Sequence, residues 1–347
     1  MITQTAATWQ TPAQIETLPL NEERSWKQEL SGAITRADEL LSLLDLADSP
    51  LARSVTAMPD FPLRVPLPYV QRMEKGNPDD PLLRQVLPVS QELVVAPGFN
   101  SDPLEEAQYN PVPGIVHKYS GRVLLITSPA CAVHCRYCFR RHFPYEDNTL
   151  GKSQWQQALD YIAGNSSIRE VILSGGDPLA ANDNHLHWLV DQLAAIKHVQ
   201  RLRVHTRFPV VIPSRIDADC LAWLTATRLT TVVVLHINHA NEIDDDVAAM
   251  IQRLRGSGIT VLNQAVLLKD VNDEVQTLTA LSERLFENGV LPYYLHLLDP
   301  VSGASHFDIA NPQAMALYRD LQAQLPGYLV PRLVRDTPGA AAKTLAF

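Results

Sequence analysis

Apolar and polar residues alternate along the second half of the chain in a pattern that predicts strands separated by helices. The short apolar runs, each typical of a buried strand, are Arg122–Thr127, Glu170–Ser174, Arg201–Thr206, Thr231–Ile237, Ile259–Leu268 and Pro292–Leu298. The segments with helical spacing between them lie near Ser153–Gly164, His185–Lys197, Ala218–Thr227, Ile243–Gly256 and Asp273–Asn288. This alternation predicts βαβ units with a parallel sheet, built as a partial (β/α) barrel or an open wound sheet. In such barrels the active site lies at the carboxyl ends of the strands.

Residues 1–110 show a different pattern and predict a helical, loop-rich extension. Leucines at helical spacing among charged residues predict an amphipathic helix over Asn21–Ala47. Prolines recur from Met58 to Pro113, which disfavours long regular elements there. We therefore divide the chain into this extension, a barrel over residues 111–330 and a C-terminal segment, residues 331–347.

Composition narrows the class of protein. The chain has 347 residues, 46% of them hydrophobic, and a formal net charge of −9, and this acidity without a basic stripe argues against nucleic-acid binding. The sequence has neither a secretory signal nor an apolar run long enough to span a membrane. Three of its four cysteines are clustered, which predicts a metal site in the reducing cytoplasm rather than disulfides. The fourth, Cys220, lies in a predicted helix and is expected to be a buried apolar residue.

The clustered cysteines, Cys131, Cys135 and Cys138, directly follow the first predicted strand. Thiolates are soft ligands that suit iron–sulfur clusters or zinc. Cubane iron–sulfur clusters usually take four cysteines, so three would leave one iron open for another ligand. The alternative is a structural zinc ion, with His134 or His142 as the fourth ligand.

A glycine-rich turn follows the second predicted strand and consists of Ser174, Gly175, Gly176 and Asp177. Alone it is an ordinary turn, although glycine also lets a backbone approach a ligand closely. The CxxxCxxC spacing and this turn together resemble the radical S-adenosylmethionine (SAM) superfamily, in which the open iron of a [4Fe–4S] cluster binds SAM. The resemblance implies that the turn contacts SAM. More loosely, it implies the same for Arg207, His236 and Gln264.

Further segments narrow the resemblance to the radical SAM lysine 2,3-aminomutase family. They run in order from about residue 60 to Lys343 and include Lys118-Tyr119, Phe139-Arg140-Arg141, Thr206–Val211, His236–His239, Asn263–Leu268, Pro292–Tyr294 and Asp336–Lys343. The resemblance implies an α/β fold, a partial (β/α)6 TIM-like barrel of the radical SAM type with a helical N-terminal extension. It is nearest to the shorter bacterial members, which make β-lysine for the modification of translation elongation factor P.

The resemblance also implies pyridoxal 5'-phosphate (PLP) as a cofactor. Lys343 matches the family lysine that forms a Schiff base with PLP, whereas outside the family it would be a solvated tail lysine. Lys118, Tyr119 and Arg122 match PLP contacts, and cationic side chains suit a phosphate, although a basic surface patch is the alternative. The chain departs from the family pattern at Lys118, where arginine is expected, and at Ala340–Ala342, where glycines are expected.

Three charged residues indicate the substrate. Arg140 matches the arginine that grips the substrate carboxylate, and Asp299 and Asp336 match two aspartates that hold the ε-ammonium group of lysine. Each aspartate alone would be an ordinary loop acid, but two carboxylates together favour a cationic side chain and repel that of glutamate. The resemblance thus implies an isomerase that moves the α-amino group of L-lysine to C3, giving β-lysine. The alternatives are an aminomutase for glutamate, arginine or ornithine, or a metal-binding scaffold without catalysis.

Partners and assembly are less defined by the sequence. The resemblance implies a functional link to the enzyme that modifies elongation factor P, and we expect neither nucleic acid nor a membrane as a partner. Longer family members carry a C-terminal segment with cysteines for a structural zinc at a subunit contact, and this sequence lacks those cysteines. We therefore expect a simpler oligomer or a monomer, located in the cytoplasm.

Overall fold

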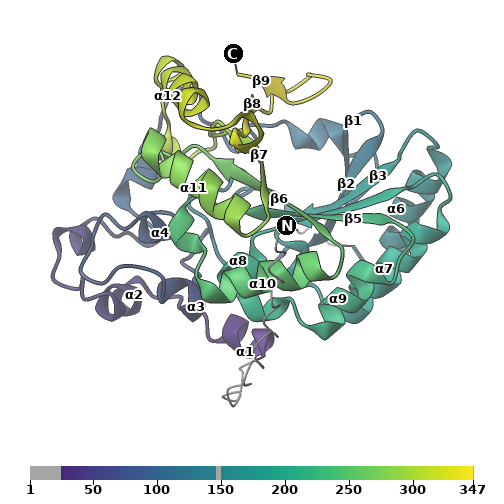
Figure 1. Ribbon diagram of the computed structural model, residues 1–347, viewed down its shortest axis with the longest axis horizontal. Coiled ribbons are helices and arrows are strands. Elements are labelled where there is room, and N and C mark those ends of the chain that lie inside the picture. Colours follow the sequence, from purple (N-terminus) through teal and green to yellow (C-terminus); the bar gives the residue numbers. More distant parts are fainter. Residues whose placement is uncertain (1–24, 146–149, 347) are drawn as a thin grey trace, which may run out of the picture.

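The computed structural model describes residues 25–145 and 150–346. Within them, one nine-stranded sheet takes its strands in chain order, and Figure 1 shows this sheet curving through the molecule. The strands are β1 (Ile115–Tyr119), β2 (Arg122–Ser128), β3 (Glu170–Gly175), β4 (Arg201–Thr206), β5 (Thr230–His236), β6 (Thr260–Val266), β7 (Leu291–His296), β8 (Arg332–Arg335) and β9 (Thr344–Leu345). Strands β2 to β8 are parallel, and β1 and β9 pair antiparallel at the two edges.

A helix follows each strand from β2 to β7 and returns the chain for the next parallel strand. These helices are α6 (Lys152–Gly164), α7 (Asp183–Ala195), α9 (Ala218–Thr225), α10 (Asp245–Gly256), α11 (Val275–Glu287) and α12 (Asn311–Gln324). They lie along the outside of the sheet (Figure 1). The predicted partial (β/α)6 barrel is therefore confirmed among the described residues, with β8 added as a further parallel strand.

Local sequence explains where the helices begin and which of their faces they bury. Asn182, Asp217 and Asp244 each accept a backbone hydrogen bond as the N-cap of α7, α9 and α10, and such a cap contributes about 1 kcal/mol. Helix α7 then buries one stripe against the sheet, at the spacing i, i+3, i+4, i+7, formed by Leu186, Leu189, Val190 and Leu193. The main core lies in this layer between sheet and helices.

The extension before β1 consists of short elements, as the prolines predict. These are α1 (Trp26–Ser31), α2 (Ala37–Leu43), η1 (Pro50–Arg53), α3 (Leu67–Val70), α4 (Pro81–Arg84), η2 (Ser90–Leu93) and η3 (Glu106–Tyr109). The remaining short helices lie in the loops between barrel elements: η4 (Pro178–Ala180), α8 (Phe208–Val211), η5 (Pro213–Arg215), η6 (Ala240–Glu242), η7 (Ser305–Phe307) and η8 (Gly327–Leu329). No helix in the described part of the chain is long and apolar enough to cross a membrane.

The prediction of one helix over Asn21–Ala47 is wrong for its described part, because α1 and α2 are separate. Gly32 ends α1, and Ile34 then exchanges two backbone hydrogen bonds with Val65, at 2.8 and 3.0 Å. This long-range bridge outweighs the local helical pattern. Residues 21–24 lie outside the described residues. The division of the chain at residues 110 and 330 stays a prediction, and the sheet continues past the second boundary, since β8 pairs with β7.

Candidate active site

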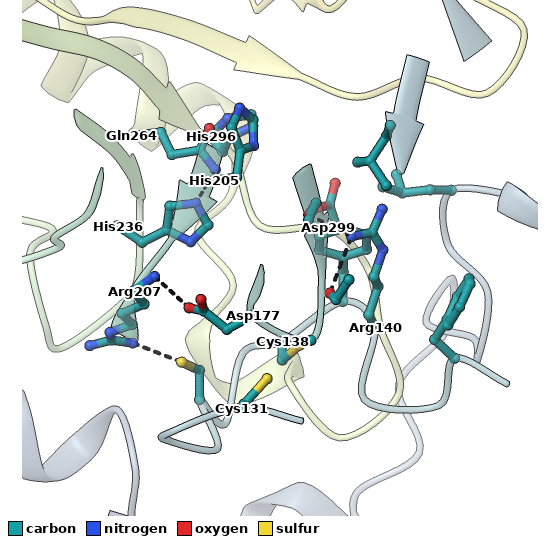
Figure 2. Close-up of a pocket in the computed structure, with 18 of the residues that line it drawn as sticks. Cys131, Cys138, Arg140, Asp177, His205, Arg207, His236, Gln264, His296 and Asp299 are labelled. Carbon is teal, nitrogen blue, oxygen red and sulfur yellow. Dashed lines mark hydrogen bonds between the residues drawn. The ribbon is translucent and has the colours of Figure 1, made fainter. Parts of the chain in front are cut away.

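A cavity of about 1040 Å³ lies inside the curved sheet and extends from the amino ends of β2 and β3, at Arg122 and Glu170, to the loops that follow the parallel strands. Figure 2 shows side chains from successive strands and loops directed into it. Every predicted site residue lines this one cavity: Lys118, Tyr119, Arg122, Cys131, Cys135, Cys138, Arg140, Ser174, Gly175, Gly176, Asp177, Arg207, His236, Gln264, Asp299, Asp336 and Lys343. Residues that are far apart in the sequence are therefore brought together in space.

The cysteine loop follows β2 and is held by the N-terminal extension. The backbone N–H of His134 donates to the carbonyl of Arg64 at 3.0 Å, and that of Arg136 donates to the carbonyl of Gln85 at 2.9 Å. The guanidinium of Arg136 also donates two hydrogen bonds to Glu92, at 2.8 and 2.6 Å. Both side chains of this ion pair are fully buried. Removing either partner would strand a buried charge, so the pair fixes the loop on the extension.

The three clustered cysteines suit a metal centre. All three are free thiols that line the cavity. Burial, followed by the charge of Cys135, raises the pKa of Cys138 to about 11, and burial also raises the pKa of Cys131. Thiolates packed in this way need nearby positive charge, which iron supplies. Among the described residues, no three His, Cys, Asp or Glu side chains are close enough together to hold a single metal ion. This spacing is compatible with a four-iron cluster, because a cluster is larger than one ion.

The two histidines of the zinc alternative have other partners. Nδ1 of His134 lies 2.8 Å from the carbonyl of Pro62, and its ring stacks on that of Phe61 with centroids 5.0 Å apart. Nε2 of His142 lies 3.3 Å from the carbonyl of Ser302. Both rings therefore bind backbone. Cys220 is fully buried in α9 and does not line the cavity, so its predicted burial is confirmed.

The glycine turn after β3 packs tightly against the start of the cysteine loop. The backbone N–H of Gly176 donates to Ser128 at 2.8 Å. A Cβ atom on Gly176 would lie 2.6 Å from the carbonyl oxygens of Pro129 and Ala130. Glycine is therefore required here for the contact between two backbone segments, a reason that the sequence did not reveal. The predicted contact of this turn with SAM stays a prediction.

We expect Gly176→Ala to displace the cysteine loop, because both clashing atoms are backbone. Overpacking of this kind destabilises a fold by about 1–3 kcal/mol, and the iron content after reconstitution should fall as well. Thermal unfolding and iron analysis would measure both effects. Gly327→Ala is the matched control, since a Cβ atom there would meet nothing within 4 Å. Equal stability and iron content in the two variants would refute this explanation.

Asp177 joins the ends of two neighbouring strands. Its Oδ1 accepts from Thr206 Oγ1 at 2.7 Å and from the N–H of Leu179 at 3.0 Å. Its Oδ2 accepts from the N–H groups of Arg207 and Phe208 at 2.8 and 2.9 Å. Burial raises the pKa of Asp177 to about 6, although these hydrogen bonds favour the carboxylate. The side chain positions the loops after β3 and β4, and its contact with SAM stays a prediction.

Arg207 lies beside the cysteines (Figure 2). Its Nη1 is 2.9 Å from the Sγ atom of Cys135, and its Nη2 donates to Glu242 at 2.9 Å and to Gln85 at 2.7 Å. The Glu242 side chain is fully buried. Arg207 thus carries a compensated positive charge next to a candidate cluster ligand. Its predicted contact with SAM is untested.

Neutral polar side chains form the wall at β4 to β7 (Figure 2). Nε2 of His236 lies 2.7 Å from Nε2 of Gln264. Burial, followed by the charge of Arg207, lowers the pKa of His236 to about 3, so the ring is neutral. Two histidines missed by the sequence analysis, His205 and His296, also line this wall, and burial lowers the pKa of each.

Asp336 connects the two ends of the sheet. It accepts hydrogen bonds from Lys118 at 2.5 Å, Tyr119 at 2.6 Å and Lys343 at 2.9 Å. Burial alone would raise the pKa of Asp336, but the ammonium groups of Lys343 and Lys118 hold it well below its usual range. Burial raises the pKa of Asp299, in contrast, to about 7. The carboxyl groups of Asp299 and Asp336 therefore differ in the pH at which they ionise.

Arg140 is already paired with an acid that the sequence analysis missed. Its Nε and Nη2 donate to the two oxygens of Glu106 at 2.8 and 2.6 Å, and both side chains are largely buried. Its Nη1 lies 3.2 Å from Ser174 Oγ and 3.4 Å from the carbonyl of Gly175. Glu106 begins the short helix η3, which carries no motif, so nothing in the sequence marked it.

Comparisons with known proteins show which proteins the chain is similar to. Residues 120–207 match the family described as a 4Fe–4S single cluster domain. Over 94% of its length the chain is 53% identical to the L-lysine 2,3-aminomutase of Haemophilus influenzae, of which it covers 96%. Over 96% of its length it is 50% identical to the L-lysine 2,3-aminomutase of Escherichia coli, of which it covers 97%. Among solved structures, that of Streptococcus suis SuiB bound to S-adenosylmethionine aligns with 63% of this chain and 51% of that chain, with a TM-score of 0.48 and 14% identity.

Proposed function

The chain belongs to the L-lysine 2,3-aminomutase family, and we propose that it is the isomerase that moves the α-amino group of L-lysine to C3, forming β-lysine. One observation supports this most directly. The cysteines of the segment that matches a 4Fe–4S domain line the same cavity as Lys343, Asp299 and Asp336, which come from the other end of the barrel sequence.

The cofactors are a [4Fe–4S] cluster, SAM and PLP, and the residues present fit all three. Cys131, Cys135 and Cys138 would hold the cluster, and Lys343 would bond covalently to PLP. Lys118, Tyr119 and Arg122 would surround the PLP phosphate, to which cationic groups are suited. When bound, the cluster and SAM would provide the radical chemistry that removes a hydrogen atom from C3, and PLP would provide the conjugated ring that lets the amino group migrate.

The part of the cavity near the cysteines would hold SAM. The proposed contacts are Ser174, Gly175, Gly176, Asp177, Arg207, His236 and Gln264. Two properties of these residues support the proposal: glycine backbone can approach a ligand closely, and the His236–Gln264 pair is polar but neutral. Asp177 would act mainly by fixing the loops after β3 and β4, since its oxygens already accept four hydrogen bonds.

The chain would orient lysine by its charges. Asp299 and Asp336 would hold the ε-ammonium group, and Arg140 would hold the α-carboxylate through the N–H groups that Glu106 leaves free. A carboxylate in a largely buried site is costly unless a cation pairs with it. Lys118 and Lys343 already pair with Asp336, so the rejection of an apolar side chain would rest mainly on Asp299. The curved sheet around the cavity would also exclude water and stray hydrogen donors.

The pKa of Asp299 leads to a prediction about pH. Asp299 is ionised above its pKa of about 7 and neutral below it, and only the carboxylate attracts the ε-ammonium group. The KM for lysine should therefore rise as pH falls, by up to roughly tenfold between about pH 8 and about pH 6. The Asp299→Asn variant should have a high KM throughout this range with a flat profile. A wild-type KM that does not change with pH would count against this role.

The proposal is tested by an anaerobic assay of the reconstituted protein with L-lysine, SAM, PLP and a reductant, with β-lysine followed by mass spectrometry. Product should require all three cofactors. If protein loaded with cluster and PLP converted arginine or ornithine but not lysine, the proposed substrate would be wrong and the proposed reaction type would stand. We propose further that the reaction takes place in the cytoplasm and supplies β-lysine for the modification of elongation factor P, which adding the product to that modification reaction would test.

A further inference from the structure

The short helix η3 of the N-terminal extension contacts two separate parts of the cavity. Glu106, at its first position, is buried and takes both hydrogen bonds described above from Arg140. Tyr109, at its last position, has a hydroxyl that accepts a hydrogen bond from the backbone N–H of Gly339 at 2.9 Å. Gly339 lies in the loop between Asp336 and Lys343. One helix of four residues thus joins the Arg140 side of the site to the loop that carries Lys343.

The contact of Glu106 determines which edge of Arg140 is available. A guanidinium group has five N–H donors in a fixed plane. Glu106 occupies the edge formed by Nε and Nη2, while Nη1 donates longer hydrogen bonds to Ser174 Oγ and the Gly175 carbonyl, at 3.2 and 3.4 Å. A carboxylate would therefore approach the edge formed by Nη1 and the second Nη2 hydrogen, where it would replace the longer hydrogen bonds of Nη1. Glu106 both neutralises the buried charge and fixes this edge.

Tyr109 also contacts Lys118, which lines the cavity. The ammonium group of Lys118 lies over the Tyr109 ring, with its Nζ atom 5.6 Å from the ring centroid. Lys118 in turn pairs with Asp336, which pairs with Lys343. The Tyr109 side chain thus contacts the Lys343 loop directly at the Gly339 backbone and is linked to it indirectly through Lys118 and Asp336. A cation over an aromatic face and a hydrogen bond are both short-range contacts, so they restrain the loop only in this position.

We propose that η3 is a positioning element, in which Glu106 orients Arg140 and Tyr109 places the loop of Lys343. This rests on the proposed function, in which Arg140 holds the α-carboxylate and Lys343 bonds to the PLP that takes the α-amino group. Both groups are attached to one carbon atom of the substrate. The distance between Arg140 and the PLP bonded to Lys343 must therefore match the distance between the two substituents of that carbon. A displacement of about 1 Å can cost on the order of 10²-fold in rate.

Two single-atom-scale variants test the two contacts separately. Glu106→Gln keeps the shape but removes the charge, and we expect the KM for lysine to rise by about 10- to 100-fold, as for a lost hydrogen bond to a charged group. Tyr109→Phe removes only the hydroxyl. The PLP concentration that half-saturates covalent binding to the chain, measured by absorbance without lysine or SAM, should rise by about 3- to 10-fold. Each variant should leave the other quantity close to that of the wild type.

Glu105→Gln and Tyr328→Phe are the matched controls, since both side chains are exposed and neither lines the cavity. General destabilisation would shift KM and PLP binding together in both variants, and that pattern would overturn the inference, as would two variants that match the controls. If Glu106→Gln does not fold, as judged by its thermal unfolding, the Tyr109→Phe result decides the question. A wild-type chain that does not bond PLP would instead refute the proposed function.

Discussion

Cys135→Ala should abolish β-lysine formation and leave the protein unable to hold a stable four-iron cluster. Cys135 is one of only three cysteines in the cavity, so the variant leaves two, fewer than a cubane cluster needs. Its thiol also lies 2.9 Å from Arg207, so the charge on that buried side chain would lose one of its partners. Because the cluster supplies the chemistry, the loss should remove nearly the whole rate enhancement, which for enzymes is about 10⁶-fold or more.

Iron analysis, the cluster absorbance and the anaerobic lysine assay measure this effect together. Cys220→Ala is the control, since this cysteine is buried in α9 outside the cavity. The control should keep its iron and its turnover. Full turnover in Cys135→Ala would show that the three cysteines do not act as proposed, whatever its iron content.

Lys343→Arg should abolish covalent binding of PLP while keeping the positive charge beside Asp336. Arginine stays protonated and offers no free amine, yet its guanidinium can still pair with the Asp336 carboxylate, which Lys343 contacts at 2.9 Å. Reduction with borohydride should therefore leave PLP attached to the wild-type chain and not to the variant. Turnover should fall by about 10²-fold or more, because PLP loses its fixed position.

The matched control is Lys197→Arg, an exposed position outside the cavity. It should label with PLP and turn over as the wild type does. Mass spectrometry of a digest would locate the reduced PLP. Label on a lysine other than Lys343, with normal turnover of Lys343→Arg, would contradict the assignment of Lys343 and direct the search to the other lysine of the cavity, Lys118.

The barrel could be predicted because short runs rich in apolar residues alternate regularly along the chain with segments of helical spacing. Each of the six predicted strands is found, with small differences at the ends. Strand β8 was missed because Arg332–Arg335 is short and begins and ends with a charged residue, so it lacks a period of its own. It forms because its backbone pairs in parallel with the edge of β7. The failed helix over Asn21–Ala47 has the same cause, a long-range pairing of Ile34 with Val65.

The site was predicted as far as its residues lie in local motifs. The cysteine loop, the glycine turn and the Lys343 segment are each contiguous in sequence, and all line the cavity. Their partners were missed, because Glu92, Glu106 and Glu242 each come from a segment without a motif and meet their arginines across long stretches of chain. Every buried arginine of the site needs such an acid, but one sequence does not tell which acid it is.

The most direct test of the central claim uses L-lysine labelled with ¹⁵N at the α-amino group, in the presence of unlabelled ammonium. The reconstituted protein is incubated anaerobically with SAM, PLP and a reductant, and the product is analysed by NMR and mass spectrometry. Migration within one molecule predicts β-lysine that carries the ¹⁵N on C3 in full, with unlabelled nitrogen at the ε position. Product that has lost the ¹⁵N, or no β-lysine from protein shown to hold both cluster and PLP, would contradict the account.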